Sequence, residues 1–278
     1  MSTPDADRIL AEATGNGVEG PHAPLHDVVR ALDAELRTFD IPDYGGAVNG
    51  LQVANRGTVR KVAVAVDASR AAISEAAICG ANLLIVHHGL FWGGAQPLTG
   101  VTYEKFRSLF GGDIAVYSTH LPLDCHAELG NNVQLARALG LAPSAGFARY
   151  KTVDVGVMGE DQLPTTDLLE RVQAFAARYG STVRTSIPAG GRTTKRWAIC
   201  TGGGASTDTL REARERGVDT LIVGEGPHHT TVEALEHDLC VVYAGHYATE
   251  TLGVQAVGAW LEQRFGLPWT FLHLPTGS

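Results

Sequence analysis

Histidine and carboxylate residues stand together at three separate places in the chain. These are the pair His87-His88, His120 with Asp124, and His246 with Glu250. Imidazole and carboxylate groups are ligands of zinc, iron, manganese and cobalt, whereas the set does not suit a thiolate-selective metal. Each cluster alone is also typical of a polar loop, a helix cap at Asp124 or a surface pair on a helix. Together, the three clusters predict a metal site.

The number of candidate ligands favours two ions over one. A catalytic zinc normally takes three protein ligands and a water, and the three clusters offer five or six. Two-metal sites hold their ions ~3.5–4 Å apart. We expect Glu250 to bridge the two ions because of its longer side chain. His120 is the catalytic candidate, as a proton carrier or weak ligand; the alternative is a histidine that only orients a ligand.

The three clusters follow the ends of predicted strands. Apolar, β-branched runs predict strands over 62–66, 83–86 and 114–117, and the intervening patterns predict helices over 69–79 and 103–110. The clusters come after Val86, Tyr117 and Tyr243. Ligand sites of open α/β sheets lie at the carboxyl ends of the strands. The spacing therefore predicts that the clusters converge.

An internal repeat organises the chain. Residues 62–86 match 199–223 at a shift of 137 positions, and Val-Tyr-x-x-His-x-x-x-carboxylate occurs at 116–124 and 242–250. These matches predict an α/β fold of two similar α/β/α layered halves from an internal duplication, with the metal site in the cleft between them. We expect a flexible lead-in over 1–24, a first half over 25–125 plus 240–278, and a second half over 126–239.

Two further segments are candidates for substrate contact. Gly203 and Ser206 lie in a glycine-rich loop over 201–206 before a predicted helix, where the backbone could approach a phosphate; a tight turn capped by Ser206 is the alternative. His228 and His229 belong to the segment of the second copy that matches His87-His88 of the first. They would line the same cavity and contact substrate; a simple polar loop is the alternative.

Composition excludes several classes of protein. The 278 residues are 44% hydrophobic and 19% charged, which suits a globular chain with a sizeable core. A net charge of -8 argues against binding to nucleic acid or anionic lipid. Four scattered cysteines argue against a disulfide scaffold. No apolar run reaches the roughly 18 residues of a membrane span and no signal peptide is evident, so we expect a cytoplasmic protein.

Four segments resemble the Nif-three-like family, also described as dinuclear-metal-centre hexameric or GTP cyclohydrolase type-two-like proteins. They are residues 49–53 (NGLQV), 67–69 (DAS), 87–92 (HHGLFW) and 245–250 (GHYATE). The resemblance spans 26–272 and implies a toroidal homohexamer of the short form, without a middle insertion domain. It carries over the metal ligands His87, His88, Asp124, His246 and Glu250 for two divalent transition-metal ions. The Leu-Pro-Leu stretch between His120 and Asp124 departs from the family pattern at positions that are not ligands.

The function expected from this resemblance is metal-dependent hydrolysis. The resemblance implies that the enzyme opens the imidazole ring of GTP with loss of formate. The substrate would be this nucleotide or another small anionic molecule. A dinuclear phosphoesterase is a related alternative. A non-enzymatic metal-binding or regulatory scaffold is the rival class, and an open coordination position at the metal would separate the two.

Overall fold

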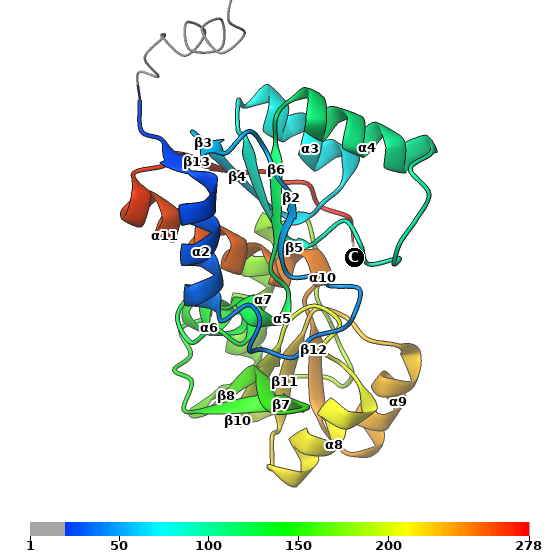
Figure 1. Cartoon of the computed structure of the whole chain (residues 1–278). Coiled ribbons are helices and arrows are strands. Elements are labelled where there is room, and N and C mark those ends of the chain that lie inside the picture. The colour runs from blue at the N-terminus through cyan, green and yellow to red at the C-terminus, as the bar shows by residue number, and fades with distance from the viewer. Residues whose placement is uncertain (1–19, 278) are drawn as a thin grey trace, which may run out of the picture.

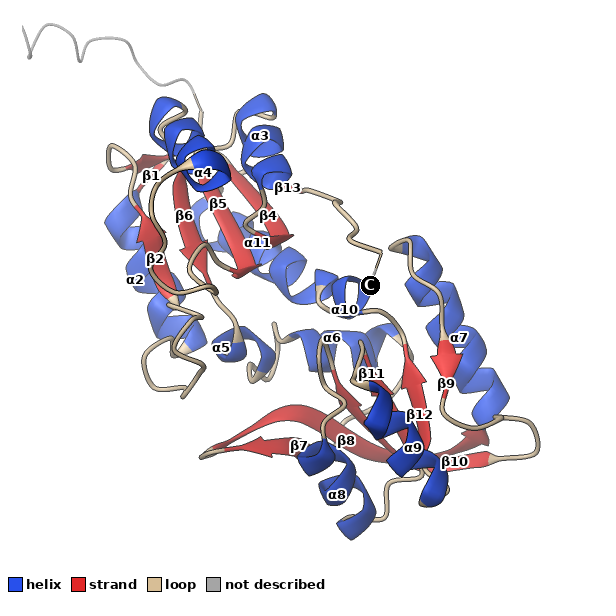
Figure 2. Ribbon diagram, turned by 90° about the vertical axis from the view of Figure 1, so that its right-hand side faces the viewer, coloured by secondary structure: helices blue, strands red, loops and turns tan. Residues whose placement is uncertain are grey.

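The structure is a computed structural model that describes residues 20–277. Its two lobes each contain one main sheet, and short helices lie between the lobes (Figures 1 and 2). This is the two-lobed α/β fold predicted from the repeat. Within the described residues, no helix has the length and apolar character needed to cross a membrane.

The first lobe is built on a five-stranded sheet. Its strands, in spatial order, are β13 (Trp269–Phe271), β4 (Val62–Asp67), β5 (Leu83–His88), β6 (Ala115–Ser118) and β2 (Gly50–Val53). The first four are parallel, and β2 is antiparallel to β6. Continuous apolar runs form the central strands because both faces of the sheet are covered.

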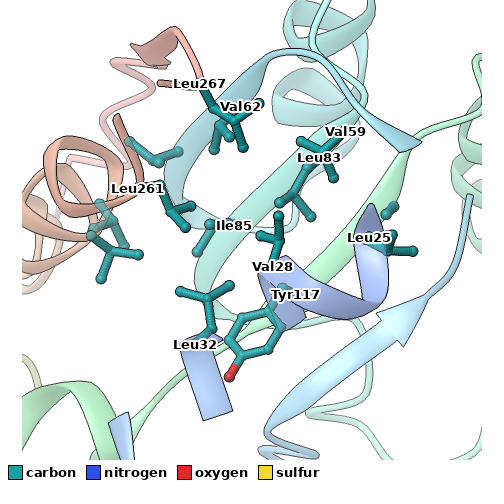
Figure 3. Packing of buried hydrophobic residues seen from close by; sticks show 14 of the residues in the cluster. Leu25, Val28, Leu32, Val59, Val62, Leu83, Ile85, Tyr117, Leu261 and Leu267 are labelled. Carbon is teal, nitrogen blue, oxygen red and sulfur yellow. The ribbon is translucent and has the colours of Figure 1, made fainter. Parts of the chain in front are cut away.

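Helices cover both faces of this sheet. Those of the first lobe are α2 (Leu25–Leu36), α3 (Arg70–Ile78), α4 (Gly100–Gly111) and α11 (Thr251–Phe265). Helices α2 and α11 pack on the face that carries Val62, Leu83 and Ile85 (Figure 3). Helices α3 and α4 cover the opposite face through Ile73 and Leu109. The expected strands and helices between 62 and 117 are confirmed, each within a few residues.

The second lobe is built on a six-stranded sheet. Its strands, in spatial order, are β7 (Ala145–Tyr150), β8 (Val153–Pro164), β10 (Thr193–Cys200), β11 (Thr220–Val223), β12 (Cys240–Tyr243) and β9 (Arg184–Thr185). Strands β10, β11 and β12 are parallel, as their counterparts β4, β5 and β6 are. The β7–β8 hairpin and β9 add antiparallel strands at the two edges.

Helices also sandwich the second sheet. Its own helices are α6 (Asn131–Ala138), α7 (Thr165–Arg178), α8 (Thr207–Glu215) and α9 (His228–Glu236). Helices α6 and α7 bury apolar side chains against one face, and α8 and α9 against the other. Two one-turn helices, α5 (Leu121–Asp124) and α10 (His246–Thr249), follow β6 and β12 and carry the repeated His-x-x-x-carboxylate motif.

Two of the expected boundaries need correction. Ala23 and Pro24, expected in the lead-in, form β1 (Ala23–Pro24), which pairs with β3 (Thr58–Val59); residues 1–19 of that lead-in lie outside the described residues. Residues 240–243, expected with the first half, form β12 of the second sheet because this apolar strand pairs with β11 and β9. By sheet membership the chain returns to the first lobe after Tyr243. The division into domains stays a prediction.

Candidate metal centre

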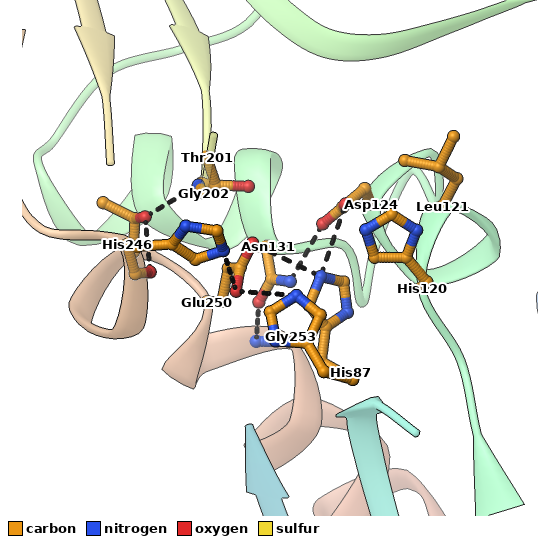
Figure 4. A network of polar contacts seen from close by, with 12 residues as sticks. His87, His120, Leu121, Asp124, Asn131, Thr201, Gly202, His246, Glu250 and Gly253 are labelled. Carbon is orange, nitrogen blue, oxygen red and sulfur yellow. Dashed lines mark hydrogen bonds and ion pairs between the residues drawn. The ribbon is translucent and has the colours of Figure 1, made fainter. Parts of the chain in front are cut away.

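The three histidine clusters converge between the lobes. His87 and His88 are contributed by the end of β5, Asp124 by α5, and His246 and Glu250 by α10 and its C-terminal end. Figure 4 shows the Glu250 carboxylate between His87 and His246, with Asp124 on the other side of His87. Parallel strands place their carboxyl ends at one edge of each sheet, and the two such edges face each other.

Two groups of ligand atoms share Glu250. The Nε2 of His87 lies 3.5 Å from both Asp124 Oδ2 and Glu250 Oε1. The other Glu250 oxygen, Oε2, lies 3.4 Å from His88 Nε2 and 3.3 Å from His246 Nε2. Ligand atoms at the corners of a tetrahedron with bonds of 2.0–2.1 Å are roughly 3.3–3.4 Å apart. His88, His246 and Glu250 therefore fit an ion, because their ligand atoms all lie within 4.8 Å of one another. The contacts of His87 with Asp124 and Glu250 also have the length expected between ligands of one ion.

Two buried polar atoms in this cluster lack a hydrogen-bond partner. Among the described residues, His87 Nε2 and Glu250 Oε2 are buried without one. Such atoms are costly unless something compensates them. His87 is completely buried, and its Nδ1 contacts the Thr119 carbonyl oxygen at 2.9 Å. The carbonyl oxygen accepts the Nδ1 proton, so Nε2 is the ring nitrogen that faces the two carboxylates. A cation between these atoms would satisfy all of them.

The electrostatics of the cluster favour positive charge. Burial lowers the pKa of His87, but the carboxylates of Asp124 and Glu250 outweigh burial and raise it to about 10. Burial is likewise outweighed at His246, where the adjacent Glu250 carboxylate raises the pKa to about 9. Burial would raise the pKa of Glu250, but His88 and His87 hold it well below its usual range. Burial raises the pKa of the Asp124 carboxyl. The cluster would exchange protons for a metal cation.

Three of the four histidines are oriented by a carboxylate. His88 Nδ1 contacts Asp67 Oδ1 at 2.9 Å and His246 Nδ1 contacts Glu225 Oε1 at 2.8 Å. His120 Nδ1 contacts Asp43 Oδ1 at 2.8 Å. A carboxylate on Nδ1 leaves Nε2 free as the ligand, which is the usual arrangement around metal-binding histidines.

His120 stands beside the cluster rather than apart from it. A ring nitrogen of His120 lies within 4.8 Å of one from His87 and one from His88. Its backbone N–H donates to Asn49 Oδ1, and the Asn49 amide donates to Asp43. These contacts explain why the Asn-Gly-Leu-Gln-Val motif accompanies the site. Its position is compatible with either a ligand or a proton carrier.

A cavity of about 800 Å³ opens beside the cluster. Its lining includes His88, His120, Asp124, His246 and Glu250. Gly203 and Ser206 line it as well, and Ser206 caps α8 by accepting the Thr209 N–H. The predicted cap is thus confirmed, whereas phosphate contact stays a prediction. His228 and His229 are exposed at the start of α9 and are not part of the lining, so this cavity gives their expected substrate contact no support.

Several supporting residues were not assigned a role from the sequence. Asp43, Asp67 and Glu225 each reach a histidine 21 to 77 positions away. Asn131 is buried, donates to Asp124 Oδ1 at 2.9 Å and accepts the Gly253 N–H at 2.8 Å (Figure 4). Asp67 and Glu225 had an available signal, because both come just after the end of a predicted strand, and Asp67 also stands in the 67–69 segment that carries the family resemblance. Asp43 and Asn131 had none.

Comparison with known proteins gives a consistent result over nearly the whole chain. The model of a family described as Duf34/NIF3 (NGG1p interacting factor 3) matches residues 24–276. A "GTP cyclohydrolase 1 type 2 homolog" from Deinococcus radiodurans is 37% identical over 266 residues, which cover 95% of this chain and 97% of the relative. A protein of the same name from Halobacterium salinarum is 40% identical over 255 residues, covering 91% and 99%.

Solved structures show the same fold. The crystal structure of TTHA1606 from Thermus thermophilus is 38% identical and superimposes with a TM-score of 0.80, covering 92% of this chain and all of that one. A structure of protein ybgI, described as of unknown function, is 35% identical with a TM-score of 0.81 and the same coverage. The short form expected from the sequence agrees with this full-length coverage.

Proposed function

The chain belongs to the Duf34/NIF3 family, and on that premise we propose that it is a metal-dependent hydrolase with a dinuclear centre. His87, Asp124 and Glu250 would hold one ion, and His88, His246 and Glu250 the other. The observation that carries the proposal is that two buried atoms of this cluster, His87 Nε2 and Glu250 Oε2, lack a hydrogen-bond partner within residues 20–277 and face the other proposed ligand atoms. The donor set suits zinc, iron, manganese or cobalt.

The cavity supports an enzyme over a purely structural metal site. A structural site is closed by protein ligands, whereas a catalytic site keeps an open position. Here His88, His246 and Glu250 all border a cavity of about 800 Å³, a size that suits small-molecule substrates. A non-enzymatic scaffold would not need such a space next to the ligands.

The residues around the centre have separable tasks. When bound, two metal ions lower the pKa of a water molecule and polarise the bond that is attacked. Glu250 presents one oxygen to each group of histidines and so fixes their spacing. Asp43 holds the His120 ring by Nδ1, which leaves Nε2 to accept a proton from the attacking water or to return it to the leaving group.

For the reaction we propose ring opening of GTP with release of formate. The proposal rests on the names of the relatives, which are homologs of GTP cyclohydrolase 1 type 2. Gly203, Ser206, His228 and His229 remain substrate-binding candidates in this proposal. A dinuclear phosphoesterase would use the same ligands on a different bond, and only the product separates the two reactions.

We also propose a homohexamer that works in the cytoplasm without membrane or nucleic-acid partners. The hexamer follows from the family resemblance. The net charge of -8 supports the absence of a nucleic-acid partner. Light scattering at micromolar concentration should give six times the mass of the 29.4 kDa chain. A monomer under these conditions would contradict the assembly.

Metal content and product analysis test the proposal together. Protein expressed with added metal should contain about two transition-metal ions per chain by elemental analysis. Incubation with GTP should then release formate, measured separately from phosphate. A His120→Gln variant that keeps its metal but loses turnover identifies a proton carrier, and one that loses metal identifies a ligand. His237→Gln, at an exposed position on the second lobe, is the control. Metal-free protein, or loaded protein without hydrolysis, would refute the hydrolase.

A further inference from the structure

The last described residues of the chain, 273–277, run from the first lobe toward α10 (Figure 2). We propose that this C-terminal segment positions the ligands of the second ion, because it fixes the short helix α10 that begins with His246 and ends beside Glu250. The inference rests on the proposed function, since it takes His88, His246 and Glu250 to hold one ion. It assigns Tyr247 as a positioning residue, whose hydroxyl joins α10 to the segment.

The segment begins beside the strand that supports His88. Strand β13 pairs in parallel with β4, and the Leu272 N–H continues this pairing by donating to the Val64 carbonyl oxygen at 2.9 Å. The Leu272 side chain is buried on the face of the sheet that α3 and α4 cover. Three residues after Val64, Asp67 ends β4 and holds the His88 ring. The start of the segment is therefore fixed to the part of the first lobe that orients His88.

The segment then contacts the residue next to His246. The Leu274 N–H donates to the Tyr247 hydroxyl oxygen at 2.8 Å, and the Tyr247 side chain is buried. The His273 ring lies nearly parallel to the Tyr247 ring, at an angle of 20° and a centroid distance of 6.0 Å. Helix α10 is a single turn of four residues, so His246 cannot shift without moving Tyr247. The hydrogen bond and the ring contact therefore restrain His246 through its neighbour.

The same segment also contacts the second lobe. Tyr179, at the C-terminal end of α7, places its ring 5.9 Å from the His273 ring and 6.5 Å from the Phe271 ring, edge-on to both. Pro275 lies beside Gly180, where an added Cβ would come 3.5 Å from the Pro275 Cβ. These contacts tie the segment to both lobes on either side of α10. It can therefore fix the distance between the lobes at this point.

The distance between the lobes matters most for the second ion, because its two histidines come from different lobes. His88 ends β5 of the first sheet, whereas His246 follows β12 of the second. Their ring centroids are 5.4 Å apart, and both Nε2 atoms face the same oxygen of Glu250. The first ion would instead take His87 and Asp124, which follow strands of the first sheet, and share only Glu250 with α10. A loosened segment should therefore affect the second ion more than the first.

Titration of two altered chains with cobalt(II) tests the inference. Cobalt(II) accepts imidazole and carboxylate ligands, and its visible absorption reports the coordination geometry. A chain that ends at Leu272 keeps β13 but loses the segment, so its affinity for the second ion should fall about 10- to 100-fold, as when a partner that orients a ligand is removed. Tyr247→Phe loses one hydrogen bond, so the same affinity should fall about 2- to 10-fold. Both changes should alter the cobalt spectrum.

Matched variants control for general effects of these changes. A chain that ends at Thr276 also has a relocated carboxyl terminus, but it keeps the contacts with Tyr247, Tyr179 and Gly180. Tyr179→Phe removes a hydroxyl from the same aromatic cluster, where it accepts a 3.5 Å hydrogen bond from Gln255. Both controls should bind the two ions as the full chain does. Urea denaturation of the metal-free proteins should show that every variant is folded under the titration conditions.

Hydrogen exchange of the metal-free proteins gives a reading that does not depend on the ions. The amides of α10 should exchange faster in the chain that ends at Leu272 than in the full chain.

Three results would overturn the inference. They are unchanged exchange of α10, unchanged affinity and cobalt spectrum in both altered chains, and equal weakening of the two ions. Turnover of GTP is assayed on the same samples. The expected loss of the second ion without product from the full chain would refute the hydrolase and leave the positioning role intact. Turnover by the full chain, with metal affinity unchanged in the altered chains, would do the reverse, so the two failures are distinguishable.

Discussion

The two copies of the repeated unit bring different side chains to equivalent strand ends. In the first copy, β5 ends in His87 and His88. In the second copy, Gly224 and Glu225 hold the matching positions after β11. Glu225 supports His246 instead of facing the cluster directly. The first copy thus supplies the pair His87-His88. The second copy supplies Glu250, which contacts His87 with one carboxylate oxygen and His88 and His246 with the other.

Space explains why the second copy has glycines where the first has larger side chains. A side chain at Gly224 would begin 2.8 Å from the Cα of His246, and one at Gly202 would collide with the Glu250 carboxylate. Gly202 also has a φ of +61°, which glycine adopts without strain. The loops of the second copy are therefore shaped to admit His246 and Glu250. At this strand end the first copy therefore has two histidines, whereas the second copy has glycine, which leaves room for its own His246 and Glu250.

The largest expected effect separates the two proposed carboxylate ligands, Glu250 and Asp124. Glu250 forms ion-pair contacts with the Nε2 atoms of His87, His88 and His246. Within residues 20–277, Asp124 forms such a contact with His87 alone. Glu250→Gln should therefore lose both ions, with affinity falling by more than about 100-fold, beyond the effect of an outer-shell change. Asp124→Asn should keep about one ion per chain. Elemental analysis after dialysis measures the difference.

A surface carboxylate provides the control for this comparison. Glu160 is exposed on β8 and pairs with Arg196, so Glu160→Gln should keep both ions. Equal loss of metal in Glu250→Gln and Asp124→Asn would show that the two carboxylates are equivalent, contrary to the bridging arrangement. Circular dichroism should show that each variant keeps its fold.

The next effect concerns the residue that joins the copies. Asn131 links Asp124 of the first motif to the Gly253 N–H that follows the second motif, and it is fully buried. Asn131→Ala leaves a carboxylate oxygen and an N–H unsatisfied, so we expect a loss of about 2–4 kcal/mol in the free energy of unfolding. Urea denaturation measures it. Gln134→Ala, on the same helix but bonded at its exposed edge, should cost at most about 1 kcal/mol.

Patterns of neighbouring residues in the sequence predicted the strands and the histidine motifs. Contacts between residues far apart in the sequence determined the rest of the fold and of the candidate site. The strands and the His-x-x-x-carboxylate motifs were predictable because each depends on residues within a few positions, such as the i, i+4 contact of His246 and Glu250. Asn131 was not, since its partner Gly253 lies 122 positions away. Strand β12 was assigned to the wrong half because an apolar run does not specify which sheet it joins. The expected contact of His228 and His229 was drawn from the repeat. The two residues are exposed at the start of α9 and do not line this cavity, and their contact with substrate stays a prediction.

The smallest expected effect tests whether the two copies contribute equally to holding the second of the two proposed ions. Asp67 in the first copy and Glu225 in the second each hold one imidazole of that ion, His88 and His246, at nearly the same distance. Asp67→Asn and Glu225→Gln should therefore weaken metal binding by similar factors, about 10- to 100-fold each, measured by competition with a chelator. Asp43→Asn extends the comparison to His120. An effect of the same size would make His120 a ligand like the other two, whereas unchanged metal affinity with slower turnover would make it a proton carrier. A large effect at Asp67 with none at Glu225 would instead mean that the first copy alone orients the centre.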